Sequence, residues 1–160
     1  MLGLMRLTLL LVPMLILGVI RGQDNKTPAP KPTVVFVCEH GSAKSVIAAT
    51  EFQRMVKESG LNVNVLTRGT NPDAEIPKLV RDGLKADGID VGTLKPTRIS
   101  ATDLAGATKI VSFGPDLRPW LPPGGTVADW SATPSVSQDY GAAQEFIKKQ
   151  LELLLKDLRK

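Results

Sequence analysis

The chain has 160 residues, 42% of them hydrophobic, which is enough for one compact domain with a buried core and too few for two ordinary domains. Its formal charge is +4, but Arg6 and Arg21 lie in an acid-free N-terminal segment, and without residues 1–23 the charge falls to +2. The other basic residues are interleaved with acidic ones and only seven aromatic residues are present, so we expect no nucleic-acid partner.

The N-terminal residues have the pattern of an export signal. Arg6 is followed by an uncharged run over residues 7–20, which suits a secretory signal peptide, because a full membrane span needs about 20 apolar residues. An uncleaved N-terminal anchor is the alternative. In either case we expect an exported domain, periplasmic or secreted, that meets the membrane only through residues 1–23. Residues 24–32 are polar and proline-rich and predict a linker, which leaves 33–160 for the folded domain.

The first predicted element is a buried strand over residues 33–38, a short β-branched apolar run (TVVFVC) that ends at Cys38. A helix is predicted over 44–58, where apolar residues recur at helical spacing before Gly60. Residues 39–43 must therefore form a tight turn from strand to helix.

The rest of the chain alternates in the same way. Strands are predicted over 62–68, 109–113 and 126–130, and helices over 76–86, 102–107 and the C-terminal stretch, while the prolines of 117–125 predict an irregular segment. Asp73 or a neighbour is expected to cap the helix over 76–86. The buried face of the C-terminal helix is predicted to carry Ala143, Ile147, Leu151, Leu154 and Leu158. This alternation predicts a single α/β domain with a four-stranded parallel sheet and helices on both faces.

Cys38 is expected at the carboxyl end of the central strand, where open parallel sheets bind their ligands. The turn that follows leads into a helix N-terminus, whose amides and dipole form an anion site and also stabilise a thiolate. Cys38 is the only cysteine, so it makes no internal disulfide. A small apolar residue closing a strand is the alternative reading, but the coincidence of thiol and anion site favours a nucleophile for phosphoryl transfer.

Each residue of the predicted site has a role that follows from its position. Cys38 attacks the phosphoryl group, Ser45 donates a hydrogen bond to the thiolate, and the Lys44 side chain supplies positive charge. The phosphoryl oxygens are expected to bind the backbone of Glu39, His40, Gly41, Ser42, Ala43 and Lys44. One histidine and one cysteine cannot supply a zinc site, so no metal or other cofactor is expected.

The stretch VVFVCEHGSAKS resembles the signature of the low molecular weight tyrosine phosphatases and their arsenate reductase relatives, in which a cysteine is followed six positions later by arginine and then serine. The likeness extends through LTRGTNPD, GLKADGIDV and KIVSFGPDL to the C-terminal helix. The resemblance implies a four-stranded parallel sheet and metal-free chemistry through a covalent cysteinyl intermediate.

The chain departs from the family pattern at the positions that matter most for catalysis. Lys44 replaces the loop arginine, so the planar bidentate contact of a guanidinium with two phosphoryl oxygens is lost. This change is expected to weaken transition-state binding by about 2 to 4 kcal/mol. Thr133 stands before Pro134 in place of the family's general acid aspartate. Asp129 is the first candidate to replace that acid and Asp139 the second, although each is also explained as a cap or a solvated carboxylate.

A single cysteine also excludes the disulfide relay of thioredoxin-linked arsenate reductases, so arsenate reduction would require an external thiol. His40 is either a proton carrier or part of the loop wall, and Glu39 is expected to point outward, because its charge would oppose anion binding. Three aromatic residues are expected either to line the mouth of the site or to pack in the core, namely Trp120, Trp130 and Tyr140.

The leading hypothesis is a phosphatase-like hydrolase of phosphomonoesters or protein tyrosine phosphate, or an arsenate reductase with an external thiol. Its partner would be a small oxyanion or phosphoester. The alternative is a non-catalytic domain of the same fold that binds phosphate or arsenate, and a weaker one is a redox sensor based on Cys38.

Overall fold

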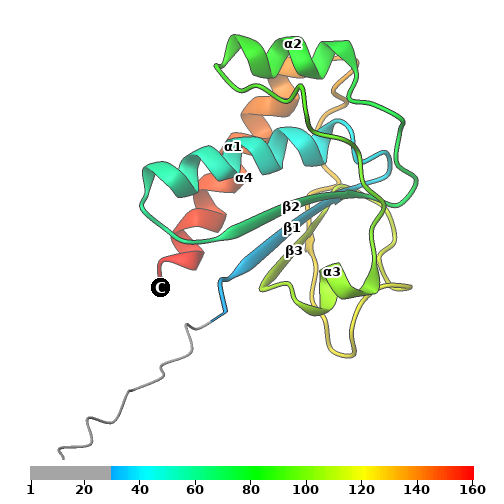
Figure 1. Ribbon diagram of the computed structural model, residues 1–160, viewed down its shortest axis with the longest axis vertical. Coiled ribbons are helices and arrows are strands. Elements are labelled where there is room, and N and C mark those ends of the chain that lie inside the picture. Colours follow the sequence, from blue (N-terminus) through cyan, green and yellow to red (C-terminus); the bar gives the residue numbers. More distant parts are fainter. Residues whose placement is uncertain (1–29) are drawn as a thin grey trace, which may run out of the picture.

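The computed structural model describes residues 30–160 (Figure 1). The predicted leader, and the predicted linker up to residue 29, lie outside the described residues. Within 30–160, no helix combines the length and the apolar character needed to cross a membrane. The first strand begins at Thr33.

The described residues form one four-stranded parallel sheet in the order β2-β1-β3-β4. The strands are β1 Thr33–Cys38, β2 Asn64–Gly69, β3 Lys109–Ser112 and β4 Ala128–Asp129. The predicted central position of β1 is confirmed, and the order reverses between β1 and β3, the place where such sheets bind ligands. β4 is shorter than predicted because the prolines and glycines of 122–125 immediately precede it and cannot extend a regular ladder.

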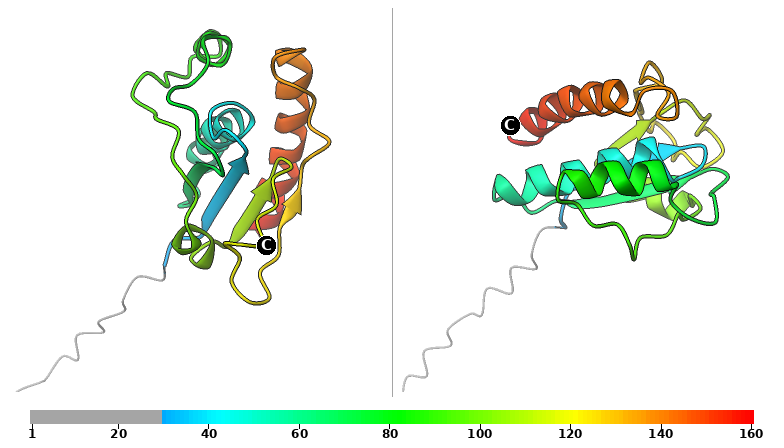
Figure 2. Two further views of the ribbon diagram at one scale, coloured as in Figure 1. Left: turned by 90° about the vertical axis from the view of Figure 1, so that its right-hand side faces the viewer. Right: turned by 90° about the horizontal axis from the view of Figure 1, so that it is seen from above.

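Helices cover both faces of this sheet, as predicted (Figures 1 and 2). They are α1 Lys44–Glu58, α2 Lys78–Ala86, α3 Ala101–Ala105 and α4 Tyr140–Leu158. On one face α1 and α4 pack together with α2 beside them, and α3 lies on the other face.

The side chains of β1 alternate between two core clusters. Val34, Phe36 and Cys38 belong to the cluster that contains α1, α2 and α4. Val35 and Val37 belong to the opposite cluster, which contains Leu104 of α3 and residues 117–121. A strand buried on both faces explains why nearly every residue of β1 is apolar, and it points Cys38 toward α1.

Two predicted details are corrected. The fully buried line of α4 ends at Leu155, and Leu154 and Leu158 are only partly buried, because the helical repeat moves the buried stripe by one residue. α2 begins at Lys78 with Pro77 as its N-cap, so the predicted cap Asp73 is free for another partner.

Candidate active site

Cys38 is the last residue of β1, and its sulfur accepts hydrogen bonds in a nearly closed environment. It is 7% exposed. The Gly41 amide donates to Sγ at 3.2 Å, and Ser45 Oγ lies 3.0 Å from the same sulfur. Thr67 Oγ1 donates to Ser45 Oγ at 2.9 Å, which leaves the Ser45 proton for the sulfur. A thiolate at this position would accept both hydrogen bonds, and Ser45 lies within reach of its predicted role.

In the loop after Cys38, the backbone carbonyl oxygens point toward residues 70–73. The carbonyls of residues 38–40 accept hydrogen bonds at 2.8 to 3.2 Å from amides of residues 70–73. All described peptide bonds are trans, so the N–H of each following residue points away from the amides of residues 70–73 that bind these carbonyls. The Gly41 amide that reaches Sγ is one of these.

Two glycines allow the loop to press against the end of β2. Gly41 has φ +59°, a left-handed conformation that disfavours side chains. A Cβ on Gly41 would lie 2.8 Å from the Gly69 nitrogen, and a Cβ on Gly69 would lie 2.7 Å from the Gly41 nitrogen. Neither position accepts a side chain without moving backbone.

The N-terminus of α1 supplies the second half of the anion site. Within the described chain no side chain caps this end at Ala43, and the first turn holds no acidic residue. The first amides of a helix have no partners inside the helix, so these remain available to an oxyanion, with the positive end of the helix dipole behind them.

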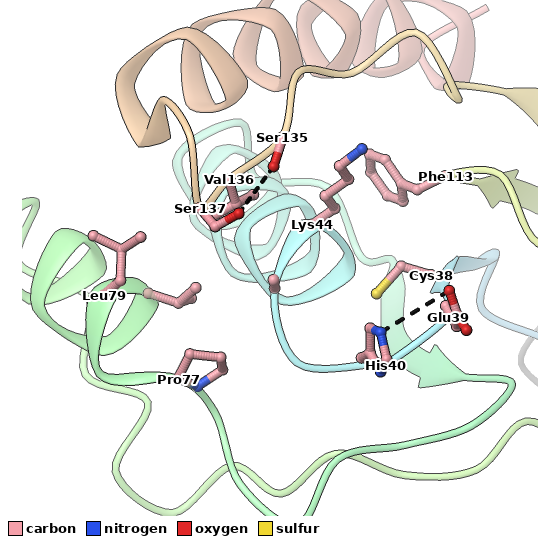
Figure 3. Close-up of a pocket in the computed structure, with 12 residues that line it drawn as sticks. Cys38, Glu39, His40, Lys44, Pro77, Leu79, Phe113, Ser135, Val136 and Ser137 are labelled. Atoms are coloured by element: carbon pink, nitrogen blue, oxygen red, sulfur yellow. Dashed lines mark hydrogen bonds and ion pairs between the residues drawn. The ribbon is translucent and has the colours of Figure 1, made fainter.

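The Lys44 side chain is engaged outside the loop. Its ammonium donates to the Thr133 carbonyl at 2.7 Å. Figure 3 shows the side chain running toward Phe113 and away from the Cys38 sulfur. An oxyanion in the loop must therefore draw Lys44 from this carbonyl before the ammonium contributes its full charge.

The loop forms the floor of a pocket of about 310 Å³ (Figure 3). Its polar lining comes from Glu39, His40 and Lys44 of the loop and from Ser135 and Ser137. Its apolar wall consists of Pro77, Leu79, Val80, Phe113 and Val136. A polar floor under an apolar wall fits a ligand with an anionic head and an apolar body.

The structure places the predicted substitutes for the missing acid elsewhere. Asp129 lines a second pocket, and the Ser131 amide donates to its carboxylate at 2.8 Å and holds the pKa of Asp129 below its ordinary value. A carboxylate with a lowered pKa in another pocket is poorly suited to protonate a leaving group above Cys38, so the geometry opposes the prediction for Asp129. Asp139 caps α4 through the Ala142 amide.

Thr133 does not face the Cys38 pocket with its hydroxyl. The residue is 4% exposed, and its hydroxyl donates to the Trp130 carbonyl at 2.7 Å. At the position where the family pattern has an acid, this chain therefore has the Thr133 carbonyl, which accepts the hydrogen bond from Lys44.

His40 lies on the rim of the Cys38 pocket and is paired with Asp73. The distance from His40 Nδ1 to Asp73 Oδ1 is 3.2 Å, and Ser42 Oγ donates to the other carboxylate oxygen of Asp73 at 2.5 Å. Glu39 is 68% exposed but also lines the pocket, and its Oε2 lies 3.9 Å from His40 Nε2, so the expectation that it points away from the site is not met. Sequence reasoning did not assign Asp73 or Thr67 to the site; the position of Thr67 on β2, beside the cysteine strand, was the available signal.

The three aromatic residues considered for the mouth pack elsewhere. Trp130 packs against Phe36 and Phe113, and Trp120 packs in the cluster on the opposite face. Tyr140 packs against the core, where burial raises its pKa to about 12 and its hydroxyl finds no partner within the described chain. The reading of these residues as packing is the one the structure supports.

Within residues 30–160, no group of three or more potential ligands among histidine, cysteine, aspartate and glutamate could hold a metal ion. The groups that the structure brings together at this site are the Cys38 sulfur, the Gly41 amide and the His40 imidazole beside Asp73.

Comparison with known proteins agrees with this arrangement. The family model of the low molecular weight phosphotyrosine protein phosphatases matches residues 33–114, just over half of the chain. No curated protein sequence matches significantly.

Solved structures share the fold at low sequence identity. YfkJ from Bacillus subtilis is 16% identical with a TM-score of 0.73, over 82% of this chain and 97% of that one. A thioredoxin-dependent arsenate reductase from Corynebacterium glutamicum is 24% identical with a TM-score of 0.67, over 84% and 65%. Wzb from Vibrio vulnificus, solved in complex with benzylphosphonate, is 13% identical with a TM-score of 0.67, over 80% and 99%. With the matched residues spanning the cysteine loop and the first three strands, the chain belongs to the low molecular weight phosphotyrosine protein phosphatase family.

Proposed function

We propose that this protein hydrolyses phosphomonoesters through a phosphocysteine formed at Cys38. The observation that carries the proposal is the sulfur itself, which accepts a hydrogen bond from the Gly41 amide and lies 3.0 Å from Ser45 Oγ, between the end of β1 and the N-terminus of α1. A thiolate and an oxyanion site at the same place are the two requirements of phosphoryl transfer to sulfur.

The reaction follows from the geometry. The amides of the loop and of the first turn of α1 hold the non-bridging oxygens, and the thiolate attacks phosphorus in line with the ester oxygen. The S–P bond forms as the P–O bond breaks, and water then hydrolyses the phosphocysteine. Lys44, drawn from the Thr133 carbonyl by the bound anion, adds charge stabilisation, although as a single point charge.

The apolar wall supports a substrate with an aromatic or aliphatic group, such as protein tyrosine phosphate. Leu79 is 48% exposed on the rim, and Phe113 and Val136 lie deeper. The benzylphosphonate complex of Wzb is in keeping with an aromatic phosphonate at this fold's site.

A non-catalytic oxyanion-binding domain is the second candidate. It is favoured by one observation, the bond from Lys44 to the Thr133 carbonyl, which joins the two positions that depart from the catalytic pattern. Arsenate reduction with an external thiol stays a prediction, because the chain carries one cysteine. We also propose that the domain is exported, with residues 1–23 as its leader or anchor.

The full chain is tested by hydrolysis of p-nitrophenyl phosphate, with trapping of phosphocysteine by mass spectrometry. We expect turnover in the parent and a loss of at least about 10³-fold in Cys38→Ser, because an alcohol is a far weaker nucleophile than a thiolate. Absence of turnover in the parent and in Lys44→Arg, with phosphate affinity retained, would establish the binding domain instead. Reduction of arsenate with added thiols, assayed in parallel, tests the remaining alternative.

A further inference from the structure

We propose that His40, oriented by Asp73, is the proton donor of the reaction in place of the carboxylic acid that is missing at Thr133. The inference rests on the proposed phosphatase function. Its starting observation is the contact between His40 Nδ1 and Asp73 Oδ1, at 3.2 Å, in the pocket that holds the nucleophile.

The pair is fixed from both sides. The Asp73 amide donates to the His40 carbonyl at 3.0 Å, and the Ser42 hydroxyl donates to Asp73 Oδ2 at 2.5 Å. Ser42 is 1% exposed. An anchored carboxylate 3.2 Å from Nδ1 favours a proton on that nitrogen, so that Nε2 is the nitrogen left to exchange a proton.

The ring lies where a leaving group can reach it. His40 and Cys38 line the same pocket, and the imidazole is 54% exposed at the rim (Figure 3). The charged groups that face it are Asp73 at Nδ1 and Glu39, whose Oε2 lies 3.9 Å from Nε2. That distance exceeds a hydrogen bond, so Glu39 does not occupy the Nε2 proton that the proposal assigns to the leaving group.

The other proton-bearing side chains of the pocket are less suitable. The Lys44 ammonium is committed to the Thr133 carbonyl. Glu39 is 68% exposed, and no hydrogen bond within the described chain fixes its carboxylate toward the leaving group. The hydroxyls of Ser135 and Ser137 are too weakly acidic to serve, whereas histidine exchanges protons near neutral pH.

The proton balance of both steps is complete with this residue. In the first step the S–P bond forms, the P–O bond breaks, and the leaving oxygen takes the electron pair and a proton from Nε2 of protonated His40. In the second step water attacks phosphorus and gives a proton to Nε2, the S–P bond breaks, and its electron pair returns to the thiolate. The sum is ester and water to alcohol and phosphate.

The experiment compares two esters on the full chain. Phenyl phosphate has a poor leaving group that needs a proton, whereas 2,4-dinitrophenyl phosphate has a good one that does not. We expect His40→Gln to lower kcat/KM for phenyl phosphate by about 100-fold and for the dinitrophenyl ester by less than about threefold, since general acids contribute on that scale. Asp73→Asn should show the same selectivity at about tenfold, because it acts only by positioning the ring.

Asp90→Asn is the matched control, with the same chemical change at an exposed carboxylate that accepts from the Gly92 amide and lines neither pocket. It should leave both rates unchanged. His40→Asn repeats the test if the glutamine variant does not fold, as judged by thermal unfolding.

Equal losses on the two esters, or no loss, would overturn the role of His40 while leaving the Cys38 phosphatase intact. Absence of Cys38-dependent turnover of the dinitrophenyl ester in the parent would overturn the proposed function and this inference together. The two failures are therefore distinguishable.

Discussion

The cysteine loop and the late loop both line the Cys38 pocket, and they differ in how closely they follow the family pattern. The cysteine loop, residues 38–45, keeps its backbone geometry through hydrogen bonds to residues 70–73 and through the contact of Gly41 with Gly69. The late loop, residues 131–137, contributes a carbonyl oxygen and serine hydroxyls in place of an acid. Under the proposed function, binding of an oxyanion would depend on the first loop, and turnover would depend on what replaces the missing acid of the second.

The backbone of the cysteine loop is tested most strongly by Gly41→Ala. Both the left-handed φ and the collision with Gly69 oppose the methyl group, so we expect a loss of about 3 kcal/mol or more in the free energy of unfolding and no measurable turnover. Gly60→Ala is the matched control, since Gly60 has φ +66° but nothing in the described chain within 4 Å of the added carbon. It should cost about 1 to 2 kcal/mol in urea unfolding and leave activity intact. Similar losses in both variants would contradict the importance of the Gly41–Gly69 contact.

The junction between the loops is tested by Lys44→Arg. A guanidinium grips two equatorial oxygens, so we expect kcat/KM for p-nitrophenyl phosphate to rise by about 30-fold, which corresponds to about 2 kcal/mol of transition-state stabilisation. Lys57→Arg, the same change at the exposed end of α1, should leave the rate unchanged. A fall in rate for Lys44→Arg would show that the pocket is shaped around lysine.

The late loop is tested by Thr133→Asp, which restores the family residue at a position that is now buried. The new carboxylate would face the Trp130 carbonyl without a proton to donate, so we expect a loss of about 2 kcal/mol in the free energy of unfolding and no gain in phenyl phosphate turnover. Thr133→Ser, which keeps the hydroxyl, should lose less than about 1 kcal/mol. A stable and faster Thr133→Asp enzyme would mean that this loop swings open to present its side chain.

The smallest loss of stability is expected when the ion pair between Arg68 and Asp103 is removed. Arg68, next to Gly69, pairs with Asp103 of α3, and the hydrogen bond from Arg68 holds the pKa of Asp103 below its ordinary value. Stability from this pair is present above the ordinary carboxyl pKa and is lost as the pH falls through the lowered folded value. We expect Asp103→Asn to lose about 1.5 kcal/mol at pH 7, and the difference from the parent to shrink below about pH 4.

Asp116→Asn is the control for that measurement. Arg118 lowers the pKa of Asp116 to about 2, but this pair is exposed and screened by solvent, so no change in unfolding is expected. Equal effects at Asp103 and Asp116 would contradict the view that the partly buried pair of Arg68 and Asp103 supports the loop.

Local patterns in the sequence predicted the part of the site that is local in the chain. The apolar run of β1, the helical repeat of α1 and the short turn between them placed Cys38 and Ser45 correctly, because each depends on neighbouring residues. The pairing of Lys44 with Thr133 joins residues 89 positions apart, and no periodicity encodes it. The sequence around Asp73 has the local pattern of a helix cap. Its carboxylate instead lies beside His40, because residues 70–73 pack on the cysteine loop, and this contact is not visible in the local sequence.

The direction of β1 also determines how the domain faces its surroundings. The strand rises about 3.3 Å per residue from Thr33 to Cys38, so the chain enters the sheet at the edge remote from the pocket. If the domain is held at a membrane through the residues before Thr33, as we propose, the Cys38 pocket would face away from that membrane.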